Sequence, residues 1–246
     1  MLFDAHVHIE DKQLAELQRL KKIGCIANAA SLEEFEFLKE LKKVQSYLYI
    51  SGGIHPWNVE KQDISKMEKL LDRVRIIGEI GLDNVWCDTN EKLQEEVFKM
   101  QLSHAVKHQK PVILHIKGKE KRAYEIIKNY ANRYLVHWYS CDEYLEEYIQ
   151  LGCWFTIGPS LSYDTSVYET AKKVPLDRIL IETDGLSACS WCEKRKVLRK
   201  EYPVILERSM KQIAEIRNLS TTKLEEIMEK NLFAFIDGEG EKLLVI

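Results

Sequence analysis

Short apolar runs alternate with amphipathic stretches along nearly the whole chain. The runs are continuous and rich in β-branched residues, as strands buried on both faces must be. We count eight of them: Leu2 to His8, Gly24 to Ala29, Tyr47 to Gly52, Arg75 to Ile80, Pro111 to His115, Tyr134 to His137, Cys153 to Ile157 and Arg178 to Ile181. Such alternation predicts repeated βα units and a parallel sheet.

The stretches between the runs have the spacing of helices. Their apolar residues recur every three or four positions, most clearly in Leu32 to Val44, Glu91 to His108, Ala123 to Tyr130 and Tyr144 to Leu151. Two predicted helix starts carry a capping side chain followed by negative charge, which helix N-termini favour. The capping residues are Ser31 and Asp142.

Eight βα units favour a closed barrel. A (β/α)8 barrel has roughly 250 residues, and this chain has 246. No internal repeat, low-complexity tract or flexible linker divides it. We therefore expect an α/β fold, a (β/α)8 TIM barrel, in a single domain spanning residues 1–246. The longest irregular piece is expected from Gly185 to about Lys200, where a long loop would serve an active site.

Charge and composition narrow the class of protein. The 36 basic and 39 acidic residues leave a formal net charge of −3, so no overall field draws the molecule to nucleic acid. No apolar run approaches the roughly 18 residues that span a bilayer, and no signal peptide is evident. We expect a soluble, cytoplasmic protein without membrane contact, its oligomeric state open and compatible with a monomer. Its six cysteines are expected to be reduced thiols.

Residue types that bind metal ions lie at the carboxyl ends of the predicted strands. His6 and His8 stand two positions apart, so both side chains point to the same face of a strand. Strand carboxyl ends share one rim in a barrel, which would bring further candidate ligands to this pair: Glu79, His115, His137 and Asp184. Four imidazoles and two carboxylates suffice for two divalent ions, with Glu79 as the natural bridge.

Each of these residues taken alone has an ordinary structural explanation. A lone buried histidine is usually a hydrogen-bonded core residue, and an aspartate after a strand often caps a helix. Six such residues on one rim are much harder to explain in that way. The identity of the ions stays open among Zn, Ni, Mn and Mg, because imidazole suits the first two and carboxylate the others.

Six motifs occur in a fixed order along the chain: DAHVH at residues 4–8, GIHPW at 53–57, IGEIGLD at 77–83, PVILH at 111–115, HWYS at 137–140 and ETD at 182–184. Together they resemble the TatD family of metal-dependent hydrolases, often described as deoxyribonucleases, within the wider amidohydrolase-like barrels. The NLFAF segment at residues 231–235 is similar to the helix that closes this family's fold.

The resemblance implies roles for the rim residues. One metal would lie between His6 and His8 and the other between His115 and His137, with Glu79 as the bridge. Asp184 would bind metal and take the proton of the attacking water, which makes Asp184 and Glu79 the predicted catalytic residues.

Two further residues receive roles from the same motifs. His55 would donate a hydrogen bond to a substrate phosphate, although a turn residue before Pro56 explains it equally well. Asp83 would orient a histidine ligand through the second ring nitrogen of that histidine. Both roles rest on the resemblance.

The chain departs from the family pattern near the expected substrate. Lys117 stands where the family usually carries arginine, which keeps the positive charge but loses bidentate phosphate geometry. After Asp184 the sequence is atypical, and Trp191 could stack a base while the basic residues that follow pair with phosphate. Those residues are Lys194, Arg195 and Lys196. A solvated charge run that opens the next helix is an equally good interpretation of them. Cys189 and Cys192 form a C-x-x-C that could bind metal or act in redox chemistry, although no second pair accompanies it.

These patterns predict a metal-dependent hydrolase, a phosphodiesterase or deoxyribonuclease that acts on nucleic-acid ends or another phosphoester substrate at a two-metal site. A metal-dependent amide, lactone or aminoacyl-ester hydrolase could use the same rim, because metal-activated water attacks carbonyl and phosphoryl centres alike. A non-catalytic metal-binding barrel is the third alternative. A phosphoesterase of the polymerase-and-histidinol-phosphatase type is disfavoured, since no histidine follows His137.

Overall fold

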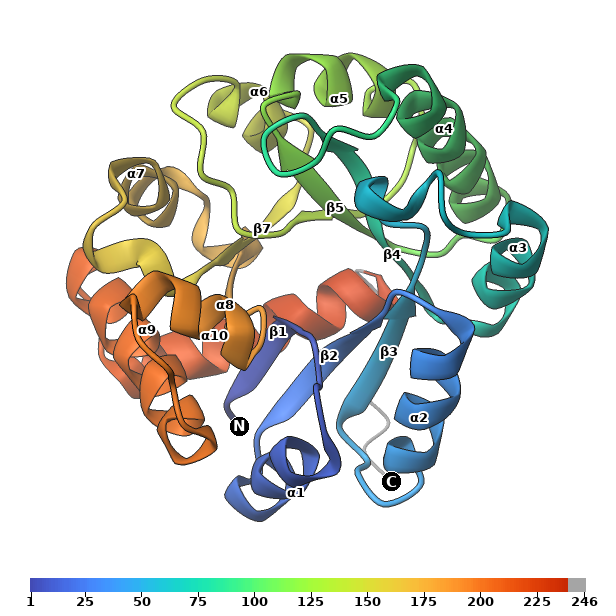
Figure 1. Cartoon of the computed structure of the whole chain (residues 1–246). Coiled ribbons are helices and arrows are strands. Elements are labelled where there is room, and N and C mark those ends of the chain that lie inside the picture. Colours follow the sequence, from blue (N-terminus) through green and yellow to red (C-terminus); the bar gives the residue numbers. More distant parts are fainter. Residues whose placement is uncertain (239–246) are drawn as a thin grey trace.

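Eight parallel strands form one sheet in chain order in the computed structural model, which describes residues 1–238. The strands lie at the centre with the helices around them (Figure 1). They are β1 Phe3–Val7, β2 Gly24–Ala29, β3 Leu48–Gly52, β4 Ile76–Asp83, β5 Val112–Lys117, β6 Tyr134–Val136, β7 Trp154–Ile157 and β8 Ile179–Ile181. Nearly all of their residues are buried, as expected for strands covered on both faces. The predicted (β/α)8 barrel is confirmed; residues 239–246 of the predicted domain lie outside the described residues.

Helices follow most of the strands. They are α1 Lys12–Lys21, α2 Leu32–Lys42, α3 Ile64–Arg73, α4 Glu91–Lys107, α5 Glu120–Ile127, α6 Leu145–Gln150, α7 Thr165–Lys173, α8 Leu186–Glu193, α9 Tyr202–Ile216 and α10 Thr221–Asp237. Short 3-10 turns lie at Pro56–Asn58, Pro159–Ser162, Leu176–Arg178 and Arg199–Glu201. The four helices singled out in the sequence are confirmed within a few residues, and residues 231–235 lie in α10 as predicted. None of the described helices is long and apolar enough to cross a membrane.

Two local predictions were wrong. Asp142 does not cap α6: that helix begins after Tyr144, which has a left-handed backbone, and Asp142 accepts a hydrogen bond from Ser166 instead. The segment from Gly185 is also not an irregular loop, because residues Leu186 to Glu193 form α8. Ser31 does cap α2, where its hydroxyl accepts the Glu34 N–H.

Strand β4 runs three residues beyond its predicted end, so Glu79 lies inside the strand rather than at its terminus. The register with β5 shifts between Ile77 and Ile80 and then continues to Asp83. Gly81 makes this close pairing possible, because a Cβ added there would lie 1.8 Å from the carbonyl oxygen of His115. The side chains of Glu79 and His115 are thereby brought onto the same rim.

The seam between β8 and β1 is held largely by side chains. The backbone N–H of Asp184 donates to the carbonyl oxygen of His6 over 3.1 Å. The buried Asp4 carboxylate accepts the Thr183 N–H at 3.0 Å and the Thr183 hydroxyl at 2.5 Å. It also accepts the hydroxyl of Tyr202, the first residue of α9, at 2.8 Å. Asp4 therefore ties the first strand to the end of the last one and to a helix behind them.

Candidate metal centre

Glu79 lies at the centre of the rim, almost completely buried, with an imidazole pair on each side. Its Oε2 atom is 3.3 Å from His6 Nε2 and 3.4 Å from His8 Nε2. Its Oε1 atom is 2.8 Å from both His115 Nδ1 and His137 Nε2. Each carboxylate oxygen thus faces a different histidine pair, which is the arrangement that a bridging ligand needs.

Asp184 completes the set on the β1 side. Its Oδ1 atom lies 3.4 Å from His6 Nε2 and 3.5 Å from His8 Nε2. The residue has a left-handed backbone (φ 58°), which aspartate tolerates better than most residues. All six side chains that the sequence proposed as metal ligands therefore lie within one cluster.

Asp83 fixes the orientation of His115. One Asp83 oxygen, Oδ2, lies 2.8 Å from His115 Nε2 and accepts the Trp57 indole N–H at 2.6 Å. The other oxygen accepts the backbone N–H groups of Val85 and Trp86. Although burial opposes it, hydrogen bonding to His115 and these donors holds the pKa of Asp83 well below its usual range. These contacts are the ones expected of a carboxylate that orients a ligand.

The tautomer that Asp83 selects indicates that the cluster fits a cation. If His115 Nε2 carries the proton that Asp83 accepts, then His115 Nδ1 presents a lone pair to the Glu79 carboxylate at 2.8 Å. The Nε2 atom of His137 lies 3.1 Å from the same Nδ1 atom. Lone pairs at these distances repel unless a proton or a metal ion lies between them. The donor set, nitrogen plus carboxylate, is also the one that zinc-like ions prefer.

The electrostatics of the cluster lead to the same conclusion. Burial alone would raise the pKa of Glu79, but the surrounding imidazoles, His137 first, lower it far below the ordinary value. Burial likewise opposes protonation of His137, yet the Glu79 and Glu182 carboxylates raise its pKa to about 9. Glu79 and Asp184 also raise the pKa of His6 against the effect of burial. The cluster therefore concentrates negative potential, which a bound cation would neutralise.

Glu182 is a neighbour of the cluster that the sequence analysis did not assign. Its carboxylate is fully buried, with Oε1 3.4 Å from His137 Nδ1 but outside hydrogen-bonding geometry. Neither oxygen has a hydrogen-bond partner among the described residues. The signal available in the sequence was a carboxylate directly after an apolar strand, two residues before Asp184. Such a residue lies on the ligand-bearing face of the rim.

His55 lies beside the cluster rather than within either histidine pair. Its Nε2 atom is 3.5 Å from Glu79 Oε1, and its Nδ1 atom accepts the Trp57 backbone N–H. Burial and the neighbouring His115 lower the pKa of His55 to about 4, so the ring is neutral. With Nδ1 as acceptor, the proton resides on Nε2. This tautomer suits a hydrogen-bond donor better than a metal ligand, and the contact with phosphate stays a prediction.

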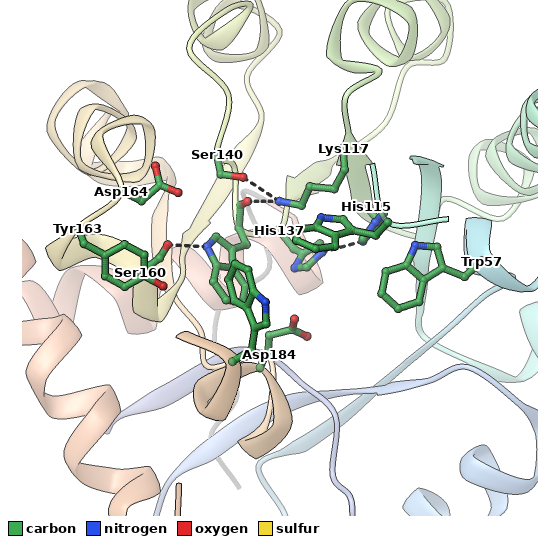
Figure 2. Close-up of a pocket in the computed structure, with 13 residues that line it drawn as sticks. Trp57, His115, Lys117, His137, Ser140, Ser160, Tyr163, Asp164 and Asp184 are labelled. Carbon is green, nitrogen blue, oxygen red and sulfur yellow. Dashed lines mark hydrogen bonds between the residues drawn. The ribbon is translucent and has the colours of Figure 1, made fainter. Parts of the chain in front are cut away.

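A cavity of about 270 Å³ opens beside the histidine–carboxylate cluster and is lined mainly by aromatic residues (Figure 2). Four tryptophans contribute to it, and Asp184, His115 and His137 form part of its wall. The tryptophans are Trp57, Trp86, Trp138 and Trp191. Trp191 packs edge-on against Trp86, with ring centroids 5.6 Å apart, and the Trp138 indole donates to Ser160. Only Trp191 of these four was predicted from the sequence as a substrate contact.

Of the basic residues predicted to bind substrate, Lys117 lies at the cavity, whereas Lys194 and Arg195 lie away from it. Lys117 lines the cavity, where its ammonium donates to the Trp138 carbonyl at 2.6 Å and to Ser140 at 3.1 Å (Figure 2). Lys194 and Arg195 are exposed after the end of α8 and do not line this cavity. The Arg195 guanidinium pairs with Glu201 at 2.8 Å. Binding of substrate by Lys194 and Arg195 stays a prediction.

The cysteines of the C-x-x-C sequence do not reach the cluster as a ligand pair. Cys189 and Cys192 lie on one side of α8, and both are buried. Burial raises the pKa of Cys189, which keeps it a thiol, and its Sγ lies 3.6 Å from the Thr183 carbonyl oxygen. All six cysteines lie within residues 1–238, and none of them forms a disulfide there. These two side chains therefore pack α8 onto the barrel.

The eight-stranded barrel and the histidine–carboxylate cluster on its carboxyl rim define the class of metal-dependent hydrolases built on this fold. The family described as TatD-related DNase matches residues 3–237, and the chain belongs to this family. The resemblance found in the sequence is thereby confirmed.

Relatives of known sequence or structure agree with this assignment. An uncharacterized metal-dependent hydrolase of Methanocaldococcus jannaschii is 29% identical over 94% of this chain and 95% of its own. A putative deoxyribonuclease of Mus musculus is 24% identical over 94% of this chain and 87% of its own. The TatD homologue YjjV of Escherichia coli has the same fold, with a TM-score of 0.82, 23% identity and coverage of 95% of this chain and 97% of that one.

Proposed function

We propose that the chain is a metal-dependent phosphodiesterase that removes nucleotides from single-stranded nucleic-acid ends. The observation that carries the proposal is the aromatic cavity directly beside the histidine–carboxylate cluster, since Asp184, His115 and His137 line both. Stacking on aromatic side chains is the usual way to hold an unpaired base. A cavity of about 270 Å³ suits one base better than a duplex.

Divalent metal would be held by His6, His8, Glu79, His115, His137 and Asp184, two ions being the prediction for this donor set. When bound, it would supply Lewis acidity toward the phosphoryl group and make water a better nucleophile at neutral pH. The protein's own contribution begins with Asp184, whose Oδ1 atom lies 3.4 Å from His6 Nε2 and whose side chain lines the cavity. Asp184 would accept the proton of the attacking water.

Lys117 and His55 would handle the phosphate. The Lys117 ammonium uses two contacts, to Trp138 and Ser140, and retains a third N–H for a phosphate oxygen in the cavity. His55 Nε2, which lies 3.5 Å from Glu79 Oε1, would donate to another phosphate oxygen. As the water oxygen bonds to phosphorus, the phosphorus–ester bond breaks, the leaving oxygen takes up the proton that Asp184 accepted from the water, and the stacked terminal nucleotide is released. Trp191, half exposed at the cavity, would hold its base.

The proposal is tested with matched substrates and added Mg²⁺, Mn²⁺ or Zn²⁺. We expect release of mononucleotides from single-stranded DNA and little hydrolysis of phosphomonoester, lactone or aminoacyl-ester substrates. Trp191→Ala should raise KM for a base-bearing end by the equivalent of about 1–3 kcal/mol. It should leave an abasic end unaffected, and Trp191→Phe should restore most of the loss. Faster hydrolysis of lactone or aminoacyl ester than of DNA would replace this function with carbonyl chemistry on the same rim.

A further inference from the structure

A second group of metal-binding side chains lies away from the candidate active site. Asp72 is the second-last residue of α3, and His104 and His108 lie in and just after the last turn of α4. These helices are neighbours on the outside of the barrel (Figure 1). Both end where the chain enters the next strand, so the group lies at the rim opposite the histidine–carboxylate cluster. One ligand atom from each of the three residues lies within 4.8 Å of the others.

Helix geometry aligns the two histidines. Residues four apart lie one above the other on a helix face, and the ring centroids of His104 and His108 are 4.4 Å apart at an angle of 30°. The His108 N–H donates to the His104 carbonyl oxygen, so the helical turn between them is intact. Two histidines at this spacing form the ligand pair of helical zinc sites. The pair is preformed, and α3 supplies a carboxylate, with Asp72 Oδ1 3.4 Å from His104 Nε2.

The surroundings of His104 favour its neutral, metal-binding form. Its Nε2 atom is shielded from solvent and has no hydrogen-bond partner among the described residues. Burial, followed by the adjacent His108, lowers the pKa of His104. The carboxyl ends of two helices also meet here, and the partial negative charge of helix C-termini favours a cation.

Lys110 lies beside this group, and its positive charge disfavours a bound cation. Its ammonium donates to the carbonyl oxygens of Leu71 and Asp72 at 2.5 and 2.9 Å, so part of the negative potential is already neutralised. This positive charge should weaken a metal ion at the site without blocking it, because these carbonyl contacts leave the Asp72 carboxylate and both imidazoles available. The site should therefore bind less tightly than the buried rim cluster.

We propose that Asp72, His104 and His108 bind a zinc- or nickel-type divalent ion that links the ends of α3 and α4. Imidazole nitrogen with one carboxylate suits these ions rather than Mg²⁺ or Ca²⁺. Three protein ligands leave one position of a tetrahedral ion for water. The Asp72 side chain is 65% exposed, so it can rotate to bring its oxygen into ligand distance.

The test is retention of the untagged full-length protein on immobilised Ni²⁺ and its zinc stoichiometry by equilibrium dialysis. We expect the native chain to be retained, and His104→Gln/His108→Gln to elute early and bind one zinc equivalent fewer. Lys107→Gln on the same turn is the matched control and should behave as the native chain. Hydrolytic activity and the metal of the rim cluster should not change in either variant.

Equal retention and equal zinc stoichiometry of the native and double-variant proteins would overturn the proposal. Because His104 is partly buried, a folding defect is controlled with His108→Gln alone, which alters an exposed side chain. Zinc should raise the thermal unfolding temperature of the native chain more than that of His108→Gln, since the ion stabilises the folded state only. An identical zinc effect on the two proteins would likewise count against the site.

Discussion

The rim cluster has two halves: His115 and His137 lie on one side of Glu79, here called the β4–β5 half, and His6 and His8 lie on the other, the β1 half. The two halves are built differently. On the β4–β5 half, His115 is fixed by Asp83, which is itself fixed by the Trp57 indole and two backbone N–H groups. On the β1 half, neither ring nitrogen of His6 has a hydrogen-bond partner among the described residues, and 38% of the His8 side chain is exposed. One ligand, His115, is therefore oriented by the protein alone, whereas no such hydrogen bond orients His6 among the described residues.

This difference indicates how each half would bind metal. A histidine held in one tautomer by a carboxylate loses little freedom when an ion arrives, which increases its affinity. The carboxylates beside His6 and His8 among the described residues are Glu79 and Asp184, which are themselves candidate metal ligands. We therefore expect the ion at His115 and His137 to be retained through purification, and the ion at His6 and His8 to exchange more readily.

The largest effect is expected from Glu79→Gln. Because Glu79 contacts both halves, the substitution should weaken metal binding in both and remove the difference between them. The substitution removes the negative charge between the imidazole pairs and leaves one good ligand oxygen, so metal content and turnover should fall together. Elemental analysis and initial rates on the same preparation measure this. Full metal occupancy with near-normal turnover would contradict the bridging role.

Asp184→Asn should affect the two halves unequally, because the Asp184 carboxylate lies 3.4 and 3.5 Å from the imidazoles of His6 and His8, although His137 is also close to it. We expect the ion at His115 and His137 to remain while kcat falls by roughly 100-fold or more, the scale of a lost general base. Metal content should thus separate this variant from Glu79→Gln more clearly than rate does. Loss of all bound metal in Asp184→Asn would argue for a purely ligating residue.

The sequence predicted the ligand set because strand alternation is a strong local signal and parallel strands share a rim. It missed α8, whose buried residues Leu186, Cys189 and Cys192 do recur every three positions but stand among glycine, serine and tryptophan with little charge. The unassigned partners, Glu182 and Asp4, act through contacts between distant segments. The position of Glu182 after an apolar strand places it on the rim, but its contact with His137 and the contacts of Asp4 with Thr183 and Tyr202 become visible only in the fold.

A smaller effect, confined to one half, is expected from Asp83→Asn. The amide keeps the shape but loses the charge that orients His115, so affinity for the ion on the β4–β5 half should fall about 10- to 100-fold. Competition with a chelator measures this affinity. Trp57→Phe, which removes only the indole N–H bound to Asp83, is the matched control and should change affinity less. Equal affinity in Asp83→Asn and the native chain would show that both halves are equally unsupported.

The smallest effect is expected from the triple substitution of Lys194, Arg195 and Lys196 by alanine. These exposed residues lie outside both halves, so metal content should not change. KM for single-stranded DNA should rise modestly at low salt and approach the native value at high salt, because screening weakens exposed charges. Lys211→Ala on α9 controls for the loss of a surface charge. A KM that matches the native value at every salt concentration would assign the run to the solvated surface.

The side-chain network at the β8–β1 seam imposes an order on assembly during synthesis. His6 and His8 are synthesised well before Asp184, which meets them only after the last strand has formed. Asp4 receives its Tyr202 hydrogen bond later still, when α9 has emerged. The nascent chain therefore carries a histidine pair with a vacant partner position through most of translation. A metal ion would therefore meet all six candidate ligands only after the residues that close the barrel have been added.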